Sequence, residues 1–471
     1  MVVDSRKHKL LMIGPLLFLG VHLMLMIVFN LRFIYFREDA WQNIPVIEMT
    51  NDPLLKIFLF HSQPPGFNLF LVLIDQFGSN SAKVFHLLYI LVTCLCIWML
   101  SDTVNHWIGN KKIAIIAGAV YAILPGTHLY TMWGFNTQLV AMLTMLSVWS
   151  FTLGKSHANN YYFTLCGLSI LMIFLVRATF IWFVAVFYLC IVLFSIGKLR
   201  NKHRIKFLFV NSAFILVVIF FTVKNILLFG VSSQSSWASE NFAKMLVYSI
   251  SSQETQSMSE KSPCYKELLE VGVFQDVRKY PICTARSDKN HLNPPRNVIL
   301  DSYVLSNGML NYNHKNRLVL ESQWRDFNYD LVSLNPKILF RGLFPSFAQE
   351  RRGSLVQYLW PNTDYKFIEP NTTKLGLFGI AWLILLGPLP LLNISLMLLF
   401  GYLIIRKNVV RSYVSSGFIF ALSITVYFSL AYILLEIGEN QRYRTEIDPI
   451  LVASSITSLY KIKNLYNSRK V

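Results

Sequence analysis

The chain has 471 residues, of which 54% are hydrophobic and 14% are charged, and its formal net charge is +18. Soluble domains carry about a quarter charged residues, so this composition excludes an ordinary soluble protein. The Lys and Arg residues form short clusters between long apolar runs, the pattern of basic loops on the cytoplasmic side of a membrane. The positive charge therefore does not indicate nucleic-acid binding, and we expect no nucleic-acid partner.

Apolar runs long enough to cross a bilayer predict an all-α polytopic membrane protein with about ten transmembrane helices. The first run, 10–33, follows a basic segment and lacks a small-residue cleavage site, so we interpret it as an uncleaved signal anchor. The segment 66–77 is apolar but too short to cross, and we expect a helix that lies at the interface or re-enters. The other predicted spans are 82–103, 111–131, 135–153, 160–176, 178–196, 207–229, 374–405, 412–436 and 446–462.

The basic clusters predict the orientation of these helices. If the N-terminus is cytoplasmic, so are the clusters at 109–112, 198–206 and 406–411 and the tail from Lys461. Treating 66–77 as a full span would place half of these clusters on the opposite side. We therefore predict that both termini face the cytoplasm, in a bacterial inner membrane in preference to an endoplasmic reticulum.

Cysteine positions agree with this topology. Cys264 and Cys283 both lie in the one long polar segment, where export would favour a disulfide between them. The other cysteines lie inside apolar runs and are expected to be reduced and buried. The chain is thus predicted to have three parts: an N-terminal transmembrane module, 1–229, with a first exoplasmic loop, 34–81; an exoplasmic loop domain, 230–373; and C-terminal transmembrane helices, 374–471.

An acidic pair, Glu38-Asp39, follows the first apolar run at the predicted exoplasmic mouth of that helix. A carboxylate there could act as a general base or hold a divalent cation, or it could only cap a membrane helix in water. Neighbouring side chains point in different directions, so one of the two is expected to be catalytic and the other supporting. His61 and Gln63 follow the pair, and His61 is either a solvated interfacial residue or a contact of a phosphate or an acceptor.

Basic residues occur at the predicted exoplasmic ends of later helices. Arg177 lies between two apolar runs and must snorkel or pair with an anion, and Lys224 is near the end of another run. Arg442 and Arg444, on either side of Tyr443, lie at the predicted exoplasmic end of the last span. The positive-inside pattern places basic residues on the cytoplasmic side, so it does not explain these two arginines. Two guanidinium groups suit bidentate binding of a phosphate. The alternative is a salt bridge with a neighbouring carboxylate: Glu436, Glu446 or Asp448.

At these residues the chain resembles the GT-C superfamily of integral-membrane glycosyltransferases, and within it the protein O-mannosyltransferase and aminoarabinose-transferase branch. The resemblance lies in the order and sidedness of motifs along most of the chain. It departs from the branch at Asn136, where many relatives carry a second acidic residue, and at Lys224, where Arg is commoner. The motifs are Glu38-Asp39-Ala40-Trp41, HSQPPGFNLFL from His61, ILPG from Ile123, LVRATFIW from Leu175, KNILLFG from Lys224 with Ser235-Ser236-Trp237, and QRYRTEIDP from Gln441.

The resemblance implies transfer of a sugar, with inversion, from a dolichyl- or undecaprenyl-phosphate donor to a protein, glycolipid or glycan acceptor at the exoplasmic face. It implies that Glu38 or Asp39 takes the acceptor proton, with a divalent cation as the one cofactor considered. The residues expected to hold the donor phosphate are Arg442, Arg444, Arg177 and Lys224. Those expected to shape the donor and acceptor sites are His61, Gln63, Asn136, Tyr443 and Trp237, the last by stacking on sugar unless it only lies at the membrane interface.

Two other functions are alternatives to a transferase. A flippase for lipid-linked sugars, or a polar-solute transporter, needs charged residues near the middle of the membrane, whereas the charges here gather at one face. A catalytically inactive membrane scaffold is compatible with Asn136 and would tolerate replacement of Glu38 and of Asp39. The sequence therefore favours the transferase.

Overall fold

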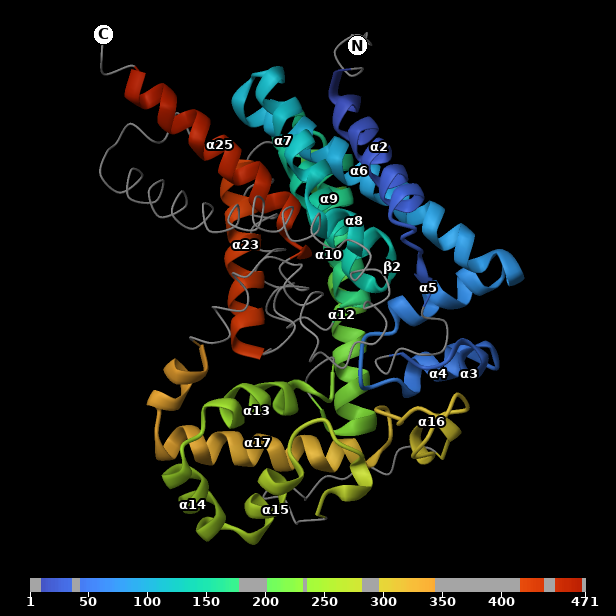
Figure 1. Ribbon diagram of the computed structural model, residues 1–471, viewed down its shortest axis with the longest axis vertical. Helices are drawn as coiled ribbons and strands as arrows, with labels where there is room; N and C mark the ends of the chain where they lie inside the picture. The colour runs from blue at the N-terminus through green and yellow to red at the C-terminus, as the bar shows by residue number, and fades with distance from the viewer. Residues whose placement is uncertain are drawn as a thin grey trace.

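The computed structural model describes residues 10–35, 43–177, 201–231, 235–281, 296–343, 416–435 and 445–467, and most residues in these ranges are helical (Figure 1). Within these ranges four helices are long and apolar enough to cross a membrane, or five if one bent pair is a single span. The prediction of an all-α polytopic membrane protein is confirmed. The predicted spans 178–196 and 374–405 lie outside the described residues.

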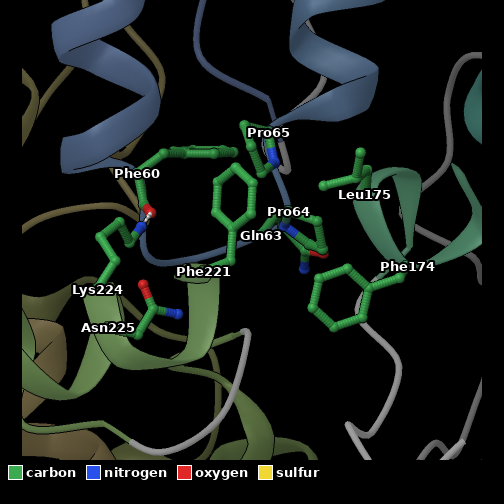
Figure 2. Close-up of a pocket in the computed structure, with 9 residues that line it drawn as sticks. All are labelled: Phe60, Gln63, Pro64, Pro65, Phe174, Leu175, Phe221, Lys224 and Asn225. Atoms are coloured by element: carbon green, nitrogen blue, oxygen red, sulfur yellow. Dashed lines mark hydrogen bonds between the residues drawn. The ribbon is translucent and has the colours of Figure 1, made fainter. Parts of the chain in front are cut away.

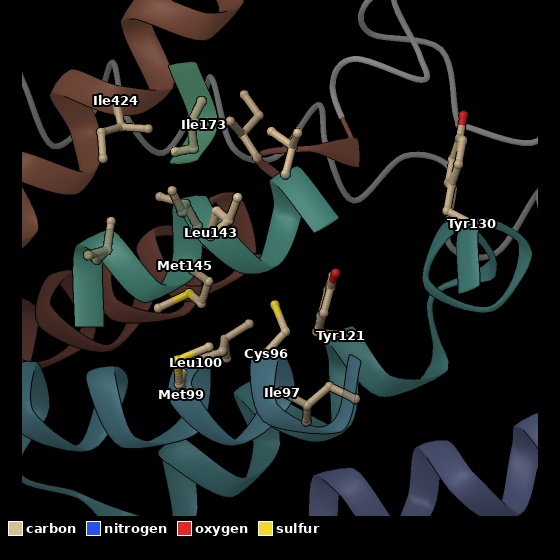
Figure 3. Packing of buried hydrophobic residues seen from close by; sticks show 14 of the residues in the cluster. Cys96, Ile97, Met99, Leu100, Tyr121, Tyr130, Leu143, Met145, Ile173 and Ile424 are labelled. Atoms are coloured by element: carbon tan, nitrogen blue, oxygen red, sulfur yellow. The ribbon is translucent and has the colours of Figure 1, made fainter. Parts of the chain in front are cut away.

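The long helices follow the apolar runs of the sequence and pack around one large buried cluster. Figure 3 shows Cys96, Tyr121 and Met145, from three different helices, in this cluster. The helix that carries Gly118 approaches its neighbour closely because glycine has no side chain: a Cβ at Gly118 would collide with Ser101 Oγ of the neighbouring helix. These helices are η1 Leu10–Met12 with α2 Ile13–Val28, α6 Ser81–Ile108, α7 Lys111–Ile123, α9 Asn136–His157, α10 Asn160–Val176, α12 Asn201–Phe229, α23 Ser416–Leu435 and α25 Asp448–Asn467.

The predicted span 111–131 consists of two helices, because the chain bends by 57° between α7 and α8, Pro125–Thr131. The cause is local: Leu124, which precedes a proline, is extended with φ −63° and ψ 133° and so ends α7. Beyond the bend, β2 Trp133–Gly134 pairs in parallel with β1 Ile34–Tyr35. This two-residue ladder ties the chain after α2 to the turn before α9.

Short helices fill the loop between α2 and α6. A separate helix is present within the predicted segment 66–77, as expected, although its position relative to a membrane stays a prediction. Its start lies against the end of α10, since a Cβ at Gly66 would be 2.5 Å from the Leu175 carbonyl oxygen. The elements of this loop are α3 Val46–Thr50, α4 Pro53–Leu59, α5 Gly66–Asp75 and η2 Gly78–Asn80.

Beyond α12, helices α13, α14, α15 and α17 share a hydrophobic cluster and are here called the α13–α17 bundle (Figure 1). The buried residues of α16, Ile299 and Leu300, belong to a separate cluster with Leu59 and Phe60. A buried ion pair joins α13 to α17, with Arg317 Nη1 2.9 Å from Glu240 Oε2. The predicted boundaries at 230 and 373 stay predictions. The elements are α13 Ala238–Ser249, α14 Ser252–Lys261, α15 Pro263–Val271, η3 Val277–Lys279, α16 Val298–Asp301 and α17 Asn316–Leu334.

Candidate functional site

A small pocket lies where the loop before α5, the end of α10 and α12 meet (Figure 2). Its empty volume is about 260 Å³, open solvent included. Gln63 and Lys224, which the sequence analysis placed in one site, both line it. Most of the remaining lining is apolar. The lining residues are Phe60, Gln63, Pro64, Pro65, Phe174, Leu175, Phe221, Lys224 and Asn225.

Lys224 is the cation of this pocket, and its side chain is largely buried at 6% exposure. Its Nζ donates a hydrogen bond of 2.8 Å to the carbonyl oxygen of Phe60, drawn as a dashed line in Figure 2. The rings of Phe221 and Phe229 lie 5.9 and 5.4 Å from Nζ. No carboxylate of the described residues forms an ion pair with Lys224. A buried ammonium is costly unless an anion compensates its charge, which makes Lys224 a candidate anion-binding group.

His61 lies next to the pocket and is buried, so the interpretation of a solvated interfacial residue is wrong. Its Nδ1 is 2.8 Å from Ser236 Oγ, and its ring centroid is 4.9 Å from that of Phe229. Burial lowers the pKa of His61 to about 3, with the Lys224 cation as a further cause. The imidazole is therefore neutral at pH 7. Its Nε2 has no hydrogen-bond partner among the described residues.

Arg177, at the end of α10, is paired with a carboxylate. Its Nε is 3.5 Å from Glu446 Oε1, with side-chain exposures of 9% and 0%. The carbonyl oxygen of Glu446 in turn accepts a 2.7 Å hydrogen bond from Thr144 Oγ1. The sequence analysis considered Glu446 as a partner for Arg442 or Arg444, and the structure pairs it with Arg177. A phosphate-binding role for Arg177 stays a prediction that has to compete with this ion pair.

Asn136 begins α9 and lies beside the end of α10. Its Nδ2 donates to the Val176 carbonyl oxygen over 3.4 Å, and within the described ranges its Oδ1 has no hydrogen-bond partner. The structure therefore brings Asn136 close to the chain segment that carries Arg177. Its predicted role in shaping the site is compatible with this position and stays a prediction.

Trp237 does not fit the role predicted for it. The indole is buried at 2% exposure and packs edge-on against Phe274 and Tyr312, with centroid distances of 5.9 and 5.4 Å. Its Nε1 donates to the Tyr312 carbonyl oxygen over 3.3 Å. A ring enclosed in this way has no free face to stack on a sugar. A tryptophan in a polar segment carries no signal of burial in the sequence alone.

Several of the predicted residues lie outside the described residues, and their roles stay predictions: Glu38, Asp39, Arg442, Tyr443, Arg444 and Cys283. Cys264 is disulfide-bonded, and Cys94, Cys96 and Cys166 are free. The pairing of Cys264 with Cys283 also stays a prediction. In the described part of the chain no group of three His, Cys, Asp or Glu side chains could hold a metal ion.

The sequence did not indicate which groups hold Lys224 and the loop before α5 in place. The carbonyl oxygen of Phe60 and the side chains of Ser236 and Asn313 all contact the loop before α5 or the lysine beside it. A backbone carbonyl has no signature in a sequence. Asn313 follows Asn311 in an NYNH segment that resembles an ordinary polar turn.

Comparison with known proteins adds little to this geometry. No family model and no curated protein matches the chain. Two solved structures are similar, those of ArnT from Cupriavidus metallidurans bound to undecaprenyl phosphate and in the apo state. They share 12% and 11% sequence identity, with TM-scores of 0.35 and 0.32, and the matches cover 94% of this chain and 77% and 76% of theirs. At these TM-scores the likeness shows neither a family nor a function for this chain.

Proposed function

We propose that the protein is a membrane glycosyltransferase of the GT-C type. It moves a sugar from a polyprenyl-phosphate donor to a protein, glycolipid or glycan acceptor at the exoplasmic face of the membrane. The observation that carries the proposal is Lys224, a buried ammonium in a largely apolar pocket with no carboxylate partner among the described residues. Burying a charge costs several kcal/mol unless an anion or a hydrogen-bond set compensates, and the donor phosphate supplies that anion.

The chemistry of the pocket suits a lipid with an anionic head. Phe60, Phe174 and Phe221 line it beside the ammonium, so a phosphate and the first part of an apolar tail both find matching surfaces. The neighbouring surface of α12 is apolar and exposed. Its exposed large side chains include Leu216, Phe220, Val223 and Leu227. In a membrane these side chains face acyl chains, which gives the tail of the donor a lateral route to the pocket.

In the proposed reaction an acceptor hydroxyl or amine attacks C1 of the sugar with inversion. The new bond to C1 forms as the bond from C1 to the phosphate oxygen breaks, and Glu38 or Asp39 accepts the proton of the acceptor. Polyprenyl phosphate leaves with one more negative charge than it carried in the donor. Lys224 stabilises that developing charge, together with Arg442 and Arg444 in the roles proposed for them.

A transfer assay tests the proposal. Membranes containing wild-type, Glu38→Gln, Asp39→Asn or Arg442→Ala protein are incubated with radiolabelled polyprenyl-phosphate sugars, and labelled acceptor is measured. Wild-type transfer should be lost in one carboxylate variant and in Arg442→Ala. The absence of transfer from any donor, together with normal complementation of a deletion strain by all three variants, would refute the enzyme and favour the scaffold.

A further inference from the structure

The backbone of the four-residue segment Leu59–Ser62, which includes Phe60 of the pocket lining, forms hydrogen bonds with several other parts of the chain. Lys224 Nζ donates to the Phe60 carbonyl oxygen at 2.8 Å, and Ser236 N donates to the His61 carbonyl oxygen at 2.9 Å. Ser235 Oγ donates to the carbonyl oxygen of Ser62. The position of the Lys224 ammonium therefore depends on the position of this backbone.

One side chain from the segment between α16 and α17 completes this set. Asn313 Oδ1 accepts hydrogen bonds from His61 N at 2.9 Å and from Ser62 N at 3.0 Å. Its Nδ2 donates to the Leu59 carbonyl oxygen at 3.1 Å. Asn313 thus forms hydrogen bonds with two backbone N–H groups and one carbonyl oxygen of the segment, and it is 252 residues away from His61 in the sequence.

Asn313 is itself rigidly placed. It is buried at 2% exposure, and its backbone N donates to Asn311 Oδ1 at 2.9 Å. Asn311 Nδ2 in turn donates to the carbonyl oxygens of Ile299 and Ser302 at 2.9 and 2.7 Å. The carboxamide is therefore fixed by α16 and its surroundings before it meets the segment 59–62.

Only a carboxamide satisfies this arrangement. Its oxygen has two acceptor sites for the two N–H groups, and its nitrogen donates to the facing carbonyl oxygen. An Asp in the same place would still accept from His61 and Ser62, but it would turn a carboxylate oxygen toward the carbonyl oxygen of Leu59. A buried donor replaced by an acceptor leaves two oxygens in contact and costs more than the lost hydrogen bond.

We propose that Asn313 is a positioning residue of the donor pocket. By holding Leu59–Ser62, it keeps the Phe60 carbonyl oxygen where it binds the Lys224 ammonium and keeps Gln63 at the pocket wall. The segment between α16 and α17 thereby determines the geometry of the phosphate site without contacting the phosphate. The inference rests on the proposed function only for the identity of the ligand.

The first test needs no ligand. Purified full-length wild-type, Asn313→Asp and Asn328→Asp proteins are labelled with acetic anhydride, and modification of Lys224 is followed by mass spectrometry. Asn328 is a matched control, because it is a buried Asn of α17 whose Nδ2 donates to the Ser239 carbonyl oxygen, outside the segment 59–62. We expect labelling of Lys224 to be about tenfold faster in Asn313→Asp only, which corresponds to about 1.4 kcal/mol. Wild-type labelling rates in Asn313→Asp would overturn the proposal.

The second test uses undecaprenyl phosphate as the probe, with its affinity measured for the same proteins in nanodiscs. Asn313→Asp should raise Kd by about tenfold or more, and Asn328→Asp should not. Equal loss of affinity in both variants would reduce Asn313 to a general stabilising role and overturn the proposal. If wild-type protein does not bind the probe, the proposed function fails, and the labelling result alone decides the role of Asn313. Asn313→Ser replaces Asn313→Asp if the latter does not fold, and the same outcomes apply.

Discussion

Replacing Lys224 by Met separates a ligand-binding lysine from a structural one. Met has a similar length and no charge, so the variant removes the ammonium and leaves the apolar stem against Phe221 and Phe229. If Lys224 binds the donor phosphate, affinity should fall while the fold stays intact. If Lys224 only donates a structural hydrogen bond to the Phe60 carbonyl oxygen, the variant should be less stable while its affinity for phosphate changes little.

The structure sets the size of both effects. A hydrogen bond to a charged group contributes about 1.5–3 kcal/mol, so losing one such bond to the phosphate raises Kd by roughly 10- to 150-fold. For stability, the orphaned Phe60 carbonyl oxygen costs about 1–3 kcal/mol, whereas removal of a buried ammonium that has no carboxylate partner among the described residues recovers several kcal/mol of desolvation, by order of magnitude. We therefore expect the Tm without ligand to be unchanged or higher.

The assay is titration of undecaprenyl phosphate into nanodiscs, with Tm measured on the same samples. Lys83→Met is the control, because Lys83 begins α6 as an exposed lysine and its replacement removes the same charge. An unchanged Kd together with a lower Tm for Lys224→Met would refute the argument that Lys224 is an anion-binding group.

Three further predictions concern stability. Arg317→Met leaves the buried carboxylate of Glu240 without its partner, so the free energy of unfolding should fall by about 3–5 kcal/mol in denaturant titrations, and an unchanged value would contradict the buried ion pair. The pKa of His61 is about 3 in the folded state and 6.5 without burial, so the unfolded state binds more protons between these values. Wild type should therefore lose up to about 1.4 kcal/mol per pH unit below pH 6.5 relative to His61→Gln, and parallel pH profiles of Tm would contradict the burial of the imidazole. Cys264→Ser removes a disulfide and should lower stability by about 2–5 kcal/mol, as should reduction of wild type, whereas a Tm insensitive to reductant would exclude a structural bond.

Much of the architecture could be predicted from the sequence, because a membrane helix depends on a local property. An apolar run of about 20 residues crosses a bilayer whatever its neighbours are. The starts of α6, α9 and α10 at Ser81, Asn136 and Asn160 lie within a residue of the predicted ones for this reason. The bend before Pro125 also had a local signal, the restriction that a proline places on Leu124, and it was overlooked.

The site was only partly predictable, because its contacts join distant segments. The sequence indicated that Lys224, Gln63 and His61 belong to one site, since all three lie at the same predicted face of the membrane. It did not indicate that Lys224 meets a backbone oxygen 164 residues away. Nor did it indicate that Arg177 pairs with Glu446, since several carboxylates were equally available in sequence.

Composition and hydrophobic patterning by themselves determined that this chain is a polytopic helical membrane protein with charged residues near helix ends. Tertiary structure alone decided which of those charges are neutralised within the protein. Arg177 has a carboxylate, whereas Lys224 has a carbonyl oxygen and two aromatic rings. The physical reason is that the energy of a buried charge depends on groups within a few ångströms in space, and chain folding sets those neighbours at any sequence separation.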